Sequence, residues 1–206
     1  MLLAGATASS RTLDEFERDL RRTPPVTTGF VDYRFSHLLR KPLQASGTLE
    51  YRADGVLARN VAAPYHELTE VLGDEVRIQR EGKPARTMSL QRAPQLRVLL
   101  GSFRALLEGR FAPLSRDFDV SLAEGAAHWT LTLIPRDPHM ARALARIQVS
   151  GTADRPECIV ALEPDGDAAF TLLETPAPGT TIPTRAALEQ RCRLDATATR
   201  AATPES

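Results

Sequence analysis

Short runs with apolar residues on alternate positions dominate the segment from residue 46 to residue 80. Three of them cover residues 47–51, 65–71 and 76–80, and the turn sequences Ala53-Asp54-Gly55 and Gly73-Asp74 separate them. A period of two places one face of each run against a core, and tight turns make successive runs antiparallel. The sequence therefore predicts a β-meander, which constrains the fold more than any other feature of the chain.

The same alternation returns in both flanks of this segment. Further strands are predicted at 30–38, 85–90, 118–122, 128–134, 146–149, 158–163 and 168–173. Glu124-Gly125 and Pro164-Asp165-Gly166-Asp167 have the composition of hairpin turns. About ten or eleven strands result.

Few helices accompany these strands. Leu13, Phe16 and Leu20 have helical spacing after a possible cap at Ser10 or Thr12, and Pro24-Pro25 stops the pattern. The clearest amphipathic helix covers residues 95–108, a short helical piece is predicted at 140–144, and a terminal helix at 186–194.

A twisted sheet of this size must curl, and its apolar concave face must be covered. The predicted fold is mainly β with a few helices (α+β): a curved antiparallel sheet forming an incomplete barrel, its concave face covered by helices. Helix 95–108 can cover only part of that face, so either a ligand or a dry core fills the rest, and periodicity does not separate the two. The predicted apolar lining is Val31, Tyr33, Phe35, Leu49, Tyr51, Leu68, Ile78, Leu99, Phe103, Trp129, Leu131, Leu133, Val160 and Phe170.

The composition is that of an ordinary globular protein. The 206 residues are 42% apolar and 25% charged, and 26 basic residues balance 26 acidic ones. With no net charge there is no global field to attract nucleic acid, and nucleic acid is not expected among the partners.

The ends of the chain differ from its centre. Residues 1–10 resemble the remnant of a secretory signal, with small residues at alternate positions. Residues 11–175 form the expected domain, and 176–206 a partly disordered extension rich in Thr, Ala and Pro. Cys158 and Cys192 are the only cysteines. Two unpaired thiols are favoured over a disulfide, which an oxidising compartment would permit.

No catalytic constellation is evident. The histidines at 37, 66, 128 and 139 stand apart without metal-ligand spacing, and no nucleophile elbow or phosphate-binding glycine loop is present. The sequence therefore predicts neither an enzyme nor a metal or cofactor site, although a hydrolase with an unrecognised site stays as a third hypothesis.

Several segments together resemble the periplasmic outer-membrane lipoprotein carriers, the LolA-like family. In the first half these are residues 30–39, Gly47-Thr48-Leu49, 57–59, Pro64, Glu67 and 73–76; in the second half 129–136, 147–149, Asp165-Gly166-Asp167 and 170–172. The similarity covers roughly residues 13–173 as a whole pattern, and it is identified as a divergent branch.

The resemblance implies an open barrel that shields acyl chains in the periplasm without chemistry. It implies a lipid or acylated protein as cargo, an inner-membrane transporter as donor and an outer-membrane acceptor, with the carrier a monomer. Helix 95–108 would be a movable lid. The family's basic latch residue beside a proline has no direct counterpart, because Arg52-Ala53-Asp54 lacks the proline; Arg52 and Arg59 are the nearest candidates. The alternative is a sensor or scaffold that binds a protein partner with the same half-barrel.

Overall fold

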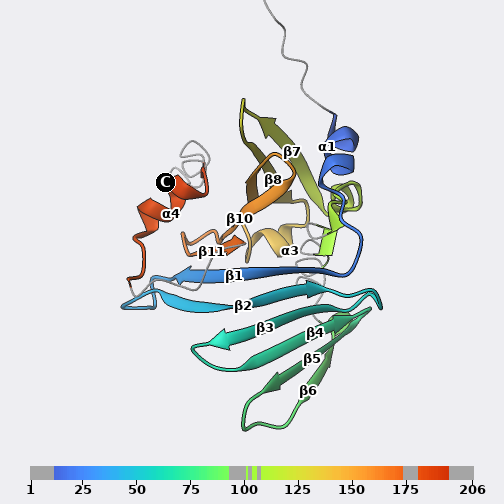
Figure 1. The fold of residues 1–206 in the computed structure, drawn as a ribbon. Coiled ribbons are helices and arrows are strands. Elements are labelled where there is room, and N and C mark those ends of the chain that lie inside the picture. The colour runs from blue at the N-terminus through green and yellow to red at the C-terminus, as the bar shows by residue number, and fades with distance from the viewer. Residues whose placement is uncertain (1–11, 93–100, 102–103, 106–107, 174–180, 195–206) are drawn as a thin grey trace, which may run out of the picture.

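The computed structural model describes residues 12–92, 101, 104–105, 108–173 and 181–194, and consists of one antiparallel sheet with helices on both faces (Figure 1). The sheet has eleven strands in the order β6-β5-β4-β3-β2-β1-β11-β10-β9-β8-β7. The strands are β1 Val26–Phe35, β2 Leu43–Tyr51, β3 Leu57–Ala63, β4 Glu67–Leu72, β5 Glu75–Arg80, β6 Arg86–Ser89, β7 Phe118–Glu124, β8 Trp129–Pro135, β9 Arg146–Thr152, β10 Arg155–Leu162 and β11 Ala168–Leu173. The helices are α1 Leu13–Leu20, α3 Pro138–Ala141 and α4 Arg185–Arg191, with 3-10 turns η1 Leu90–Arg92 and η2 Ala112–Arg116.

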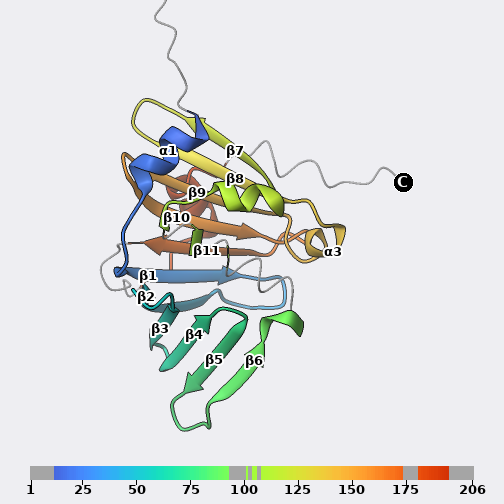
Figure 2. The same cartoon turned by 90° about the vertical axis from the view of Figure 1, so that its right-hand side faces the viewer.

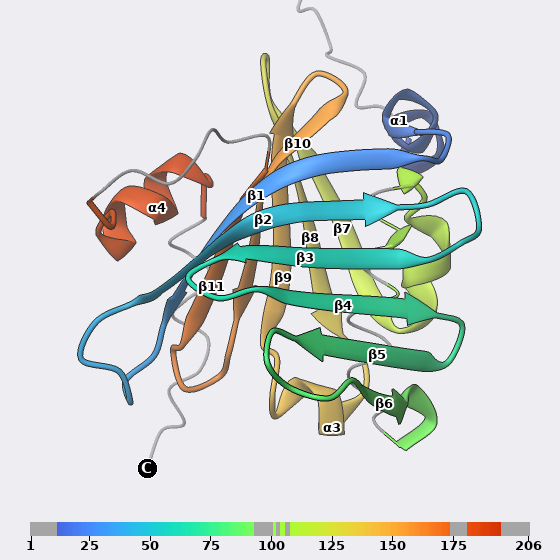
Figure 3. The ribbon, with the colours of Figure 1, turned by 60° about the horizontal axis from the view of Figure 1, so that its bottom comes forward.

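Two meanders meet at the centre of the sheet. The pairing of β1 with β11, from Phe30 opposite Leu173 to Phe35 opposite Ala168, joins strands β1–β6 to strands β7–β11. The sheet curves around an inner face that carries α1 and α3, while α4 lies on the outer face (Figures 2 and 3). Among the described residues its end strands β6 and β7 do not pair with each other, so the predicted incomplete barrel is confirmed.

Strand β3 is the element that the alternating pattern did not reveal. Arg59 occupies the inner-face position between Leu57 and Val61, where a third apolar residue would have completed the pattern. Beside it, β2 and β3 approach closely: a Cβ atom on Gly47 would lie 1.8 Å from the carbonyl oxygen of Asn60. Glycine at this position is therefore a requirement of the strand pairing.

The inner core lies between the inner face of the sheet, with members from β1–β3 and β7–β11, and the elements α1, α3 and η2. Thr12 caps α1 in a capping box with Glu15, which confirms the predicted helix and its start. Phe16 of α1 is fully buried, packs edge-on against Trp129 with ring centroids 4.8 Å apart, and stacks on Phe111 at 5.8 Å. Leu131 and Leu133 complete this cluster at 0% exposure. One end of the inner face is thus a dry, well-packed core.

The outer face of the central strands is covered by α4. Thr184 caps this helix, and Leu188 is buried against the sheet. Cys192, at its end, forms a disulfide with Cys158 of β10, with the Cα atoms 5.5 Å apart. The expectation of two unpaired thiols was wrong, because α4 folds back across a sheet whose course a separation of 34 residues along the chain does not reveal.

Most of the predicted helix 95–108 lies outside the described residues. Its described members, 101, 104, 105 and 108, are helical. Arg104 donates to the Tyr51 hydroxyl at 2.7 Å and to Glu108 at 2.9 Å, and Ala105 belongs to the inner core. These contacts attach this end of the helix to the inner face, and its role as a lid stays a prediction.

A candidate ligand cavity on the inner face

The inner face changes character along the length of the central strands. Next to the inner core, register aligns Leu173, Phe30, Gly47 and Val61 in one row across β11, β1, β2 and β3. The three large side chains in this row are all buried in the inner core. This end of the face is filled by the protein's own side chains.

Further along, toward the β1–β2 hairpin, the inner-face side chains become small. The next row is Ile159, Thr171, Asp32 and Ala45, and the row after it is Ala161, Ala169, Arg34 and Leu43. These two rows contain Ala45, Ala161 and Ala169, whereas the row next to the inner core has Phe30, Leu173 and Val61. Because an alanine leaves the space that a larger side chain would fill, this end of the inner face is hollow.

A cavity of about 770 Å³ occupies this hollow. The lining is Asp32, Tyr33, Arg34, Leu43, Gln44, Ala45, Arg59, Pro64, Tyr65, Met140, Ala143, Leu144, Ile159, Ala161, Glu163, Ala169 and Thr171. Met140 of α3 and Ile159 of β10 are buried at its depth, whereas Leu43 and Tyr65 are 56% and 43% exposed. The cavity therefore opens to solvent beside the β1–β2 hairpin and the β3–β4 connection.

Two ion pairs belong to the cavity wall. Arg34 donates to Glu163 with 2.8 Å between Nη2 and Oε1, near the opening. Arg59 pairs with Asp32 through Nη2, and its guanidinium lies 4.6 Å from the centre of the Phe30 ring. Each arginine is matched by a carboxylate, so the charged side chains of the wall sum to zero. The cavity consequently has no excess charge to attract an ion, and its remaining wall is largely apolar.

Most of the apolar residues predicted as lining on the inner face belong to packed structure instead. Leu49, Trp129, Leu131 and Leu133 lie in the inner core. Tyr51 packs with Leu57 in a small separate cluster. Ile78 pairs with Thr69 and is partly buried. None of these six residues lines the cavity.

Other predicted lining residues lie on the opposite face of the sheet. Val31, Tyr33, Val160 and Phe170 are buried under α4 together with Leu188, and this corrects their assignment to the concave face. The central strands are buried on both faces, so each carries two alternating sets of apolar residues. The prediction assigned the set that is richer in aromatic residues to the concave face. Of the predicted apolar lining residues that the structure describes, only Tyr33 also contributes to the cavity wall.

The remaining predictions for this lining are placed as follows. Phe35 packs edge-on against Phe170, with ring centroids 5.8 Å apart, on the outer face. Register puts Leu68 opposite Asn60 and Gln79, on the face away from Arg59. Leu99 and Phe103 lie outside the described residues.

The two candidate latch residues occupy different places. Arg52 follows β2 and pairs with Glu70 at 2.8 Å and Glu50 at 3.2 Å, away from the cavity. The hydrogen bond to Glu70, followed by that to Glu50, raises the pKa of the Arg52 guanidinium. Arg59 lines the cavity, but its described partners are Asp32 and Phe30. A latching role of either residue stays a prediction.

Apart from Tyr33 and Arg59, sequence reasoning missed the residues that define the cavity. The signal was the set of small residues Ala45, Ala161 and Ala169, together with the charged residues Asp32 and Arg34 inside a predicted strand. Only the register, which places Ala161 opposite Ala169 and Asp32 opposite Ala45, brings them to one spot. An alternating pattern of apolar residues does not reveal a hollow that small residues form.

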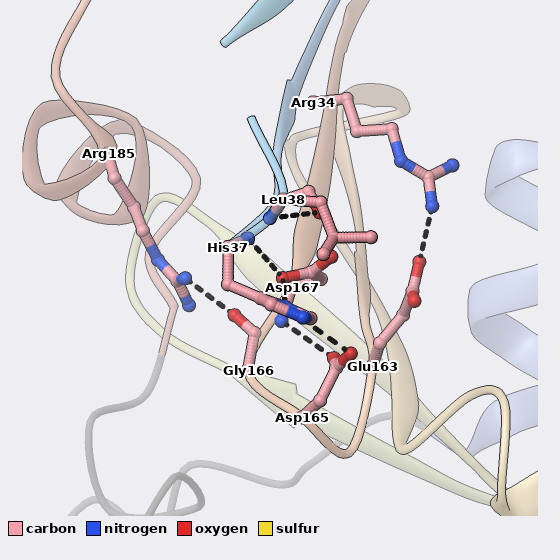
Figure 4. A network of polar contacts seen from close by, with 9 residues as sticks. Arg34, His37, Leu38, Glu163, Asp165, Gly166, Asp167 and Arg185 are labelled. Atoms are coloured by element: carbon pink, nitrogen blue, oxygen red, sulfur yellow. Dashed lines mark hydrogen bonds and ion pairs between the residues drawn. The ribbon is translucent and has the colours of Figure 1, made fainter. Parts of the chain in front are cut away.

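A polar cluster fixes the base of the β1–β2 hairpin beside the cavity (Figure 4). His37 donates from its backbone N–H to Asp167 Oδ1 at 2.9 Å, and its ring Nδ1 lies 2.9 Å from the same oxygen and 3.7 Å from Asp165 Oδ2. Arg185 of α4 donates to the carbonyl of Gly166 at 2.6 Å. The ligand atoms of His37, Asp165 and Asp167 fall within 4.8 Å of one another. We call the contacts of His37 with Asp165 and Asp167 the clasp, because they hold the start of the β1–β2 connection to the β10–β11 turn. Since this structural role explains each contact, we assign no metal to the cluster.

The clasp predicts a pH-dependent stability. Hydrogen bonds from Ser36 and then from the His37 backbone lower the pKa of Asp167 from 3.8 to about 2. The hydrogen bond to Asp167, followed by its charge and those of Asp165 and Glu163, raises the pKa of His37 above 6.5. The Asp167 contribution is thus present above pH 3.8 and lost as pH falls toward about 2. The His37 contribution is present below pH 6.5 and lost as pH rises through the raised pKa.

We expect the stability difference between wild type and His37→Gln to be larger near pH 5.5, below the unfolded-state pKa of histidine, than near pH 9. Urea unfolding at both pH values measures it. An equal difference at both would contradict a charged clasp.

Comparison with known proteins identifies the family of this chain. Residues 5–201 match the profile of the family described as outer membrane lipoprotein carrier protein LolA-like, and the chain belongs to that family. The family relationship implied by the sequence pattern is confirmed. A search of curated proteins finds no match.

Solved structures with a similar chain path include three with low identity. The LolA superfamily protein NE2245 from Nitrosomonas europaea is 8% identical with a TM-score of 0.40, covering 81% of this chain and 93% of that one. LprF from Mycobacterium bovis is 11% identical with a TM-score of 0.37, covering 84% and 94%. MucB in complex with MucA(peri) is 12% identical with a TM-score of 0.36, covering 86% and 59%. Sequence identities and TM-scores this low say nothing about shared ligands or partners.

Within the described residues, no helix combines the length and the apolar character needed to cross a bilayer.

Proposed function

We propose that this protein is a non-enzymatic carrier that holds an acyl chain of a lipid or lipoprotein in the cavity on the inner face of its sheet. The observation that supports the proposal most is the hollow itself, which the small side chains of Ala45, Ala161 and Ala169 leave open. A cavity of about 770 Å³ lies within the range usual for ligand pockets, roughly 300–1,000 Å³.

An acyl chain suits this wall better than a polar ligand does. Met140, Leu144 and Ile159 contribute apolar surface to the wall together with the alanines. Each buried methylene contributes about 0.8 kcal/mol, so ten of them would contribute about 8 kcal/mol before the entropic costs of binding. A ligand held this strongly is released by opening of the cavity or by a partner that competes for it.

The charged residues place the polar end of the ligand at the opening. Arg34 and Glu163 lie near the mouth and already form an ion pair, as Arg59 and Asp32 do further in. Because both arginines are neutralised, the cavity has no preference for an anionic carboxylate at its depth. The acyl chain enters first and its headgroup stays at the mouth.

The family and the disulfide together support an exported protein of the periplasm. Disulfides persist in oxidising compartments, and Cys158 and Cys192 are joined here. In this proposal residues 1–10 are the remnant of a signal, residues 11–175 form the carrier domain, and helix 95–108 is its lid. An inner-membrane donor and an outer-membrane acceptor complete the route of the cargo.

Acyl-chain binding is tested with delipidated protein and a fluorescent long-chain fatty acid. We expect saturable binding by the wild type and at least tenfold weaker binding by Ala161→Phe, because a phenyl ring fills the hollow. Ala123→Phe makes the same change at an exposed position of β7 and should bind as the wild type does. Absence of saturable binding by the wild type, or equal binding by Ala161→Phe, would overturn the proposal.

A further inference from the structure

The connection between β1 and β2 carries an exposed apolar and basic surface beside the opening of the cavity. Leu38 is 81% exposed, Leu39 is 36% exposed and Leu43, at the start of β2, is 56% exposed. Arg40 and Lys41 lie between them and are exposed as well. We call residues 38–43 the hairpin tip. In Figure 3 the β1–β2 connection extends beyond the neighbouring strand ends.

The basic residues of the tip are free to meet an external anion. Neither Arg40 nor Lys41 forms an ion pair with any residue in the part of the chain that the structure describes. Arg34, Arg52, Arg59 and Arg80, in contrast, are all paired with carboxylates. Two cationic side chains are therefore held next to two exposed leucines.

The base of the tip is fixed, and the tip is continuous with the cavity. The clasp of His37 on Asp167 ties the start of the connection to the β10–β11 turn, and Arg185 ties that turn to α4 (Figure 4). At the other end of the tip, Leu43 is both exposed and part of the cavity wall. A surface that touched the tip would thus lie directly over the mouth of the cavity.

We propose that the hairpin tip docks on a bilayer surface that contains anionic lipids, with Leu38 and Leu39 entering the headgroup region and Arg40 and Lys41 contacting lipid phosphates. Apolar side chains flanked by cations match the two layers of such an interface, where hydrocarbon begins just beneath a charged surface. Docking in this orientation presents the cavity mouth, between Leu43 and Tyr65, to the membrane. The inference concerns an interaction surface and stands independently of whether the cavity binds an acyl chain.

Vesicle co-sedimentation with the full chain tests this docking. The vesicles contain phosphatidylethanolamine and phosphatidylglycerol, and pure phosphatidylcholine vesicles serve as the neutral comparison. We expect binding to the anionic vesicles that weakens with added salt. The double variant Leu38→Ser/Leu39→Ser should bind at least tenfold more weakly. Arg40→Gln/Lys41→Gln should lose about fivefold for each charge removed.

Matched controls make the same changes far from the tip. Leu72→Ser alters a leucine at the end of β4 that is as exposed as Leu43. Lys83→Gln/Arg86→Gln removes two exposed charges at the sheet edge. Both controls should bind vesicles as the wild type does, and circular dichroism should show all variants folded. The proposal is overturned if the wild type does not bind anionic vesicles, or if tip and control variants bind them equally. It is also overturned if the tip variants bind vesicles as the wild type does and lose only their binding to a protein partner.

Insertion of the tip has its own spectroscopic readout. The chain has a single tryptophan, Trp129, which is buried at 2% exposure and packed against Phe16. In the variant Leu38→Trp, the new indole should shift its emission to shorter wavelength when anionic vesicles are added, while wild-type emission stays constant. Emission of Leu38→Trp that does not respond to the vesicles contradicts insertion. Fatty-acid binding measured without vesicles should be equal in tip variants and wild type, which separates this inference from the carrier proposal.

Discussion

Replacing Leu131 with alanine should lower the free energy of unfolding by about 2–5 kcal/mol. Leu131 is 0% exposed in the inner core, between the sheet and the helices that cover it, and truncation leaves a void that the surrounding side chains cannot fill. Chemical denaturation measures the loss. Acyl-chain binding by the folded variant should be unchanged, because Leu131 does not line the cavity.

Ile134→Ala on the same strand is the matched control. Ile134 is 49% exposed, and its truncation should change stability by less than about 0.5 kcal/mol. A Leu131→Ala protein of nearly normal stability with strongly weakened acyl-chain binding would contradict the dry inner core. It would favour the lining predicted from the sequence instead.

Removing the disulfide should cost about 2–4 kcal/mol of stability. The double variant Cys158→Ala/Cys192→Ala frees α4 from β10, and the unfolded chain regains the entropy of a loop closed over 34 residues. The loss is expected at the outer face, where Gln148 and Ser150 also hold the end of α4 through the carbonyl of Cys192. Thermal or urea unfolding under non-reducing conditions measures it.

Reductant provides the internal control for this prediction. Dithiothreitol should lower the stability of the wild type toward that of the double variant and leave the double variant unchanged. Thiol titration of the unfolded, non-reduced wild type should find no free thiol. Two titratable thiols in protein purified from an oxidising compartment would contradict the bond.

All strands except β3 were predictable because each of them carries its own signal. The alternating runs in residues 47–80 became β2, β4 and β5, and the turn at Glu124-Gly125 became the β7–β8 hairpin. Thr12, one of the two possible caps in the sequence, starts α1. These signals are local, so neighbouring residues suffice to recognise them.

Assignment of a face required information that is not local. Val31 and Phe30 are adjacent in β1 and equally buried, but one lies under α4 and the other lies in the inner core. Period two separates the two faces without saying which is concave, and only the return of α4 across the sheet decides it. Phe170 and Val160 were therefore placed on the wrong face together with Val31.

The cavity depends on pairing over long distances. Ala161 and Ala169 are brought opposite each other by the β10–β11 hairpin, and Arg34 joins them from the other end of the chain through β1. Composition does not reveal the hollow, because alanine is a common residue and none of these alanines is unusual when its position is considered by itself. The general expectation of an uncovered part of the face came from the sheet size, but its location required the register.

The most direct test of the central claim is the position at which a bound acyl chain contacts the protein. A fatty acid with a photoreactive diazirine in its chain can be bound to the delipidated wild type, irradiated, and mapped by peptide mass spectrometry. The account predicts labels on the cavity wall, within residues 140–144 and at Ala161 or Ala169, that disappear when unlabelled fatty acid competes. Competable labels at Trp129 and Leu131, or at Phe170 beneath α4, would contradict it, as would a protein that takes up no competable label.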